Sequence, residues 1–172
     1  MAVSRSRRSL AGVVFIIAGA LFLLTALLPY LGFVVPWLLV LAAVAMTVAF
    51  AVLAIGAVNS TLSKVLLIVA AVGWAVLALA SLVALPTTLV ILAEIIAGVA
   101  GLVAAILLYA GKEITNTSAV IFIVATALGL LFLLNVAGTL PLASLAIVVL
   151  VLFGVALIAT GYYFTRKERG RR

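Results

Sequence analysis

Residues 88–110 read TLVILAEIIAGVAGLVAAILLYA, an apolar run that contains a single charged side chain, Glu94. An α-helix rises 1.5 Å per residue, so about 20 apolar residues cross a hydrocarbon core about 30 Å thick. This run is therefore predicted to be a transmembrane helix. Its flanks differ, because an uncharged segment ending in Pro86 precedes it and the charged segment GKEITNTS (111–118) follows it.

The whole chain has the same character. Of its 172 residues, 70% are hydrophobic and 8% are charged, whereas soluble domains have roughly 45–50% apolar and 25% charged residues. The runs lack the alternation of a transmembrane barrel. We therefore expect a single-domain, all-α polytopic membrane protein. Six runs are long enough to span a bilayer: Ser9–Leu28, Val35–Val58, Val65–Leu85, Thr88–Ala110, Ala119–Gly138 and Leu142–Phe164.

Charge separates the connections between these runs into two kinds. The first, third and fifth connections contain proline and no charge, whereas the second and fourth each contain a lysine, Lys64 and Lys112. The remaining basic residues lie in or beside the tails 1–8 and 165–172. The positive-inside rule places this side in the cytoplasm. We therefore predict a multi-pass protein of the cell membrane with both termini cytoplasmic.

An internal repeat is predicted from recurring dipeptides. Leu-Pro occurs at Leu28-Pro29, Leu85-Pro86 and Leu140-Pro141, and Lys-Glu occurs at 112–113 and 167–168. These spacings divide the chain into three pseudo-repeated helical hairpins, about 9–58, 65–110 and 119–164. Three hairpins of equal topology, packed side by side, would form one six-helix bundle.

The three hairpins, with proline at the outer turns, precede a final stretch PLASLAIVVLVLFGVALIATGYY (141–163). In this pattern the chain resembles the HdeD-like short-repeat membrane proteins of bacteria. The resemblance implies six spans and an association with stress resistance. It brings no catalytic residues to this sequence.

The residue types that the chain lacks argue against metal sites, cofactors and catalysis. The chain has no cysteine or histidine, and its three acidic residues are all glutamates. We expect no metal site, no cofactor and no enzymatic activity, because no nucleophile is paired with a base. The net charge of +7 flanks apolar runs, so its expected partners are membrane lipids, including anionic head groups, and not nucleic acid. The sequence leaves homo-oligomerisation open.

Glu94 is the candidate functional residue. A charged group at mid-membrane costs about 2.5–3.5 kcal/mol on insertion scales, so such residues face protein or water. Glu94, Gly98, Gly101 and Ala105 share one helix face, and small residues let helices approach closely in lipid. We therefore predict that this face packs against neighbouring helices.

Four polar residues lie at a similar predicted depth and are candidate partners of Glu94: Ser81, Asn135, Thr25 and Ser144. One interpretation is a solute or proton site, in a channel or transporter for small solutes or ions. The other, which we favour, is a protonated acid that donates a hydrogen bond across a non-enzymatic, structural or stress-associated membrane protein. No span contains an internal proline that would interrupt it, as broken helices do in transporters.

Overall fold

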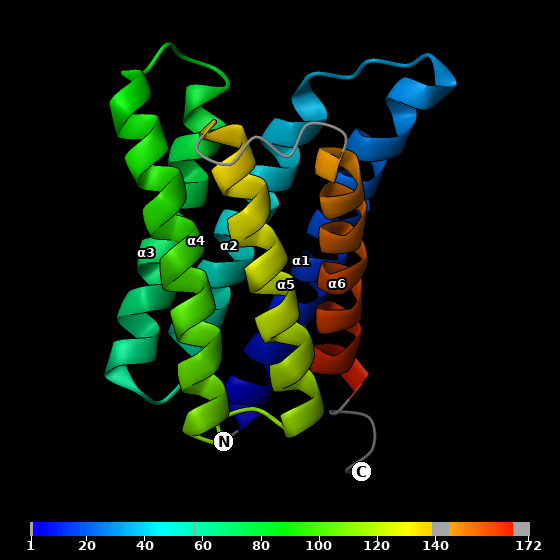
Figure 1. The fold of residues 1–172 in the computed structure, drawn as a ribbon. Helices are drawn as coiled ribbons and strands as arrows, with labels where there is room; N and C mark the ends of the chain where they lie inside the picture. The colour runs from blue at the N-terminus through cyan, green and yellow to red at the C-terminus, as the bar shows by residue number, and fades with distance from the viewer. Residues whose placement is uncertain (1, 57, 139–144, 167–172) are drawn as a thin grey trace.

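The computed structural model describes residues 2–56, 58–138 and 145–166 (Figure 1). These residues form six α-helices: α1 (Ala2–Leu27), α2 (Trp37–Gly56), α3 (Thr61–Ala80), α4 (Thr87–Ala110), α5 (Asn116–Val136) and α6 (Ala146–Arg166). A short 3-10 helix, η1 (Leu28–Leu31), extends α1. All six α-helices are long and apolar enough to cross a membrane. The predicted all-α fold with six spans is confirmed.

The helix limits follow local chemistry. Helix α3 starts four residues before the predicted span because Ser60 caps it, its Oγ accepting the Ser63 N–H at 3.5 Å. The same helix ends at Ala80, five residues before the predicted end at Leu85. Leu85 precedes Pro86, and a residue before proline is disfavoured in helical geometry. The predicted start of the sixth span, Leu142–Ser144, lies outside the described residues.

The six helices form a closed ring in which each contacts its two neighbours. Helix α1 packs on α2 and α6, and the remaining contacts follow chain order from α2 to α6. Neighbours run antiparallel, so α1 starts and α6 ends at the same end of the bundle (Figure 1). We call this the charged end, since it holds Lys64, Lys112 and Glu113. The opposite, uncharged end holds the α1–α2 and α3–α4 connections.

Two layers of aromatic rings fill the centre of the ring. Within each layer, neighbouring ring centroids lie 4.9 to 6.5 Å apart, a spacing typical of attractive aromatic pairs. All eight side chains are buried. The charged-end layer comprises Phe15, Phe50, Phe122 and Phe164. The uncharged-end layer comprises Phe22, Trp74, Phe132 and Phe153.

Glycines bring the first and last helices together. A Cβ atom on Gly19 would lie 2.5 Å from the carbonyl oxygen of Gly154, and one on Gly12 would lie 2.8 Å from that of Gly161. In each helix the two glycines are seven residues apart, which places both on one face. We call these four residues the glycine seam. The seam lets the α1 and α6 backbones touch, which closes the ring.

Candidate intramembrane site around Glu94

Glu94 lies inside the bundle on α4. Its side chain is 1% exposed, and seven residues separate it from Thr87, where α4 begins at the uncharged end. At 1.5 Å per residue, this places its Cα about 10 Å from the start of the helix. The carboxyl group therefore lies in the membrane-spanning part of the protein, away from the surface that faces lipid.

The small residues next to Glu94 are buried with it. Gly98 faces α5, where an added Cβ would lie 2.6 Å from Leu130 Cδ1 and 3.1 Å from Leu130 Cα. Gly101 faces the centre of the ring, and the nearest atom to its added Cβ would be Phe50 Cζ at 3.6 Å. Ala105 is fully buried. Glu94 and these three residues thus share the inward face of α4.

One oxygen of the Glu94 carboxyl, Oε1, is buried without a hydrogen bond to any of the described residues. Buried polar atoms in proteins nearly always have a partner. The predicted cross-bundle hydrogen bond is therefore not formed by Oε1 within the part of the chain that the structure describes.

The expected partners lie elsewhere. Ser81 is exposed at the end of α3, and its hydroxyl donates to Leu77 O at 3.0 Å. The Thr25 hydroxyl donates to Leu21 O at 2.8 Å, and α1 makes no contact with α4. Asn135 is half-buried in the last turn of α5, the helix next to α4. Ser144 lies outside the described residues. Of these residues, only Ser81 and Asn135 come from helices adjacent to α4.

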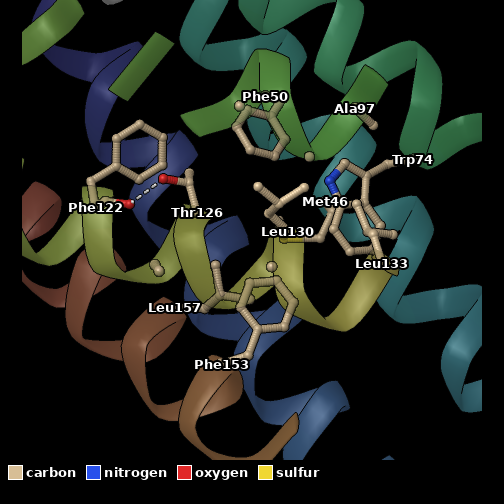
Figure 2. Close-up of a pocket in the computed structure, with 14 residues that line it drawn as sticks. Met46, Phe50, Trp74, Ala97, Phe122, Thr126, Leu130, Leu133, Phe153 and Leu157 are labelled. Carbon is tan, nitrogen blue, oxygen red and sulfur yellow. Dashed lines mark hydrogen bonds between the residues drawn. The ribbon is translucent and has the colours of Figure 1, made fainter. Parts of the chain in front are cut away.

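A small cavity lies between the two aromatic layers (Figure 2). It measures about 10 Å³, and Phe50 and Phe122 line it from one layer, Trp74 and Phe153 from the other. The hydroxyl of Thr126 is already bonded to Phe122 O at 2.9 Å and Ile123 O at 3.0 Å. A buried water needs two to four polar partners, and Thr126 is the one polar side chain in this lining, so the cavity is a poor site for water. Glu94 is not among its lining residues.

A second polar feature, which the sequence analysis missed, ties two connections at the charged end. The Glu113 carboxylate accepts the backbone N–H of Asn59 at 2.7 Å and that of Ser60 at 3.2 Å. These N–H groups immediately precede α3, where a negative charge is favoured by the helix dipole. Glu113 therefore holds the α4–α5 connection against the start of α3. The sequence signal was the lone acid beside Lys112 in a polar connection.

No metal centre is present among the described residues, since no three His, Cys, Asp or Glu side chains gather there. No family model matches the sequence, and no curated protein or solved structure is similar enough to match it. The HdeD-like resemblance therefore stays a prediction.

Proposed function

We propose that this chain is a non-enzymatic membrane protein that acts through contacts with lipids and partner proteins, and does not conduct solutes. The observation that supports this function best is the filled interior. Each aromatic layer takes rings from four of the six helices, and the cavity between the layers is about 10 Å³ and mostly apolar. A conduction pathway needs polar or charged groups along it.

The proposed lipid contacts have two parts. Large apolar side chains cover the outside of the ring, as expected of helices surrounded by acyl chains. The basic tails flank the first and last spans, where each lysine or arginine near an anionic membrane surface contributes about 1 kcal/mol. This proposal places the charged end in the cytoplasm of a cell whose inner leaflet is anionic. A role under stress rests on the HdeD-like resemblance alone.

The second candidate function is a channel or transporter for a small solute or ion, with Glu94 on its path. The buried carboxyl of Glu94, whose Oε1 has no partner among the described residues, favours it, because ionisable residues within spans often mark such pathways. Against it, the charged-end aromatic layer lies between Glu94 and the charged end, since its Phe50 faces Gly101, two turns further along α4.

Reconstitution into liposomes separates the two candidates. The purified protein is tested with a panel of monovalent ions and small neutral solutes, and protein-free liposomes serve as the baseline. We expect no flux above the baseline. A flux that appears with the native chain and disappears with Glu94→Gln would establish the channel or transporter instead.

A further inference from the structure

We propose that Glu94 is a proton-binding site that exchanges with water from the uncharged end of the bundle alone. This inference goes beyond the proposed function, since a bundle that passes no solute can still bind and release a proton. It rests on three features: an unpartnered carboxyl oxygen, the absence of a nearby cation among the described residues, and the position of Glu94 relative to the charged-end aromatic layer.

The first feature is the buried, unpartnered Oε1 of Glu94. Glu94 is 1% exposed, and its Oε1 has no partner among the described residues. An unsatisfied polar group in hydrocarbon costs several kcal/mol. A purely structural acid would be held by hydrogen bonds from its neighbours. A group left unpaired in this way instead has its binding capacity free for a species that arrives from water.

The partner of Glu94 has to come from water, because no charged side chain of the described residues can pair with its carboxyl group. Helix α4 packs on α3 and α5. The charged residue of α3 is Lys64, in its first turn at the charged end, and α5 has none. The other titratable group of α4 is Tyr109, which is exposed at the charged end. The proton is the smallest ligand that neutralises the carboxylate, and it needs no preformed cavity.

The position of Glu94 gives the direction of exchange. The Cα–Cβ bonds of a helix tilt towards its N-terminus, which for α4 lies at the uncharged end, so the Glu94 side chain leaves the backbone in that direction. Ala97 and Gly98, one turn further along α4, already line the cavity between the layers. Trp74 lines the same cavity and belongs to the uncharged-end layer. Trp74 itself is level with Glu94, because its neighbour Gly73 packs against Ala93 and Ala97. The cavity and the charged-end aromatic layer therefore lie between Glu94 and the charged end.

Single cysteines test this direction without background, because the native chain has none. Glu94→Cys is compared with Gly101→Cys, a matched control on the same face of α4, about 10 Å deeper at 1.5 Å per residue. The Gly101 site accepts a Cβ atom, since its nearest neighbour atom would be 3.6 Å away, and the cavity that Gly101 lines gives space for the sulfur. Each variant, in proteoliposomes of known orientation, is exposed on one side to a small, membrane-impermeant methanethiosulfonate reagent.

We expect Glu94→Cys to react at least tenfold faster from the uncharged end than from the charged end, and Gly101→Cys to react from neither. Reaction of Glu94→Cys from the charged end would overturn the proposed direction. Absence of reaction from both ends, or equal rates for both cysteines, would overturn access from the uncharged end.

Infrared spectroscopy tests the native side chain, so the proposal does not depend on a cysteine variant that folds. The chain has only three acidic residues, and the difference between native protein and Glu94→Gln isolates the Glu94 signal in lipid nanodiscs. We expect a carboxylic acid C=O band that is lost reversibly as the buffer becomes alkaline. A band that stays constant across the range, or a carboxylate band throughout, would refute proton exchange. Neither outcome changes the flux test of the proposed function.

Discussion

The glycine seam between α1 and α6 allows a sharp test of how the ring is held together. The perturbation is Gly19→Ala, which adds one methyl group where the α1 and α6 backbones approach closely. Its Cβ would lie 2.5 Å from the backbone carbonyl oxygen of Gly154, whereas ordinary contact begins near 3.4 Å. The two helices would have to separate by about 0.9 Å, because a backbone carbonyl cannot rotate away as a side chain does.

The expected magnitude combines two opposing effects. Overpacking of a close-packed interior costs about 1–3 kcal/mol, and a clash with backbone belongs in the upper half of that range. Replacing a mid-helix glycine by alanine returns about 0.8–1.0 kcal/mol. We therefore expect Gly19→Ala to lower the free energy of unfolding by about 1–2 kcal/mol. The control Gly101→Ala makes the same exchange with its nearest atom at 3.6 Å, so it should gain about 1 kcal/mol.

The assay is unfolding in mixed micelles with increasing sodium dodecyl sulfate. Fluorescence of the buried Trp74 reports the loss of the aromatic layers, in a background where the exposed Trp37 is replaced by phenylalanine. The midpoint should fall for Gly19→Ala and rise for Gly101→Ala. A Gly19→Ala protein as stable as its parent would refute the role of the seam, as would an equal loss in both variants.

Three further predictions concern the ends of the bundle and Glu94. Single cysteines at Ser60 and Thr117, both exposed, should be labelled only from the cytoplasm and one at Thr87 only from outside; the reverse pattern would contradict the positive-inside assignment. Ser118 is unsuitable as a labelling site, because it is buried and hydrogen-bonded to Thr115 at 2.9 Å. Glu113→Ala removes both N–H contacts before α3 and should cost about 1 kcal/mol in the same unfolding assay, whereas Lys64→Ala should change little; equal effects would argue against the contact. Glu94→Leu should raise the free energy of unfolding by about 1–3 kcal/mol, since it removes an unsatisfied buried polar group; a loss of stability would mean that Glu94 has a partner after all.

The transmembrane helices could be predicted from the sequence, but which helices contact one another could not. Apolar length, Pro86 on one side and charges on the other predicted α4 to within one residue, because hydrocarbon thickness and the cost of buried charge act on each segment alone. Depth also placed Thr25 level with Glu94, yet α1 and α4 do not touch in the ring. Which helices are neighbours in a ring depends on how their small residues pack together. Alanine and glycine occur in every span, so these residues do not distinguish one pair of helices from another. For the same reason, the pairing of Gly19 with Gly154 could not be singled out.

The glycine seam has a consequence for how the protein is made. The ring is completed by its first and last helices, so α1 must remain in the bilayer without α6 until the whole chain has been inserted. A truncated chain without α6 would expose the glycine face of α1 to lipid. The seam also makes α1 and α6 neighbours, and the start of α1 and the end of α6 lie at the same end of the bundle (Figure 1). A circular permutant that links α6 to α1 and opens the α3–α4 connection should therefore form the same ring. In that protein α4 is inserted first and contacts α3 only after the last helix has been inserted.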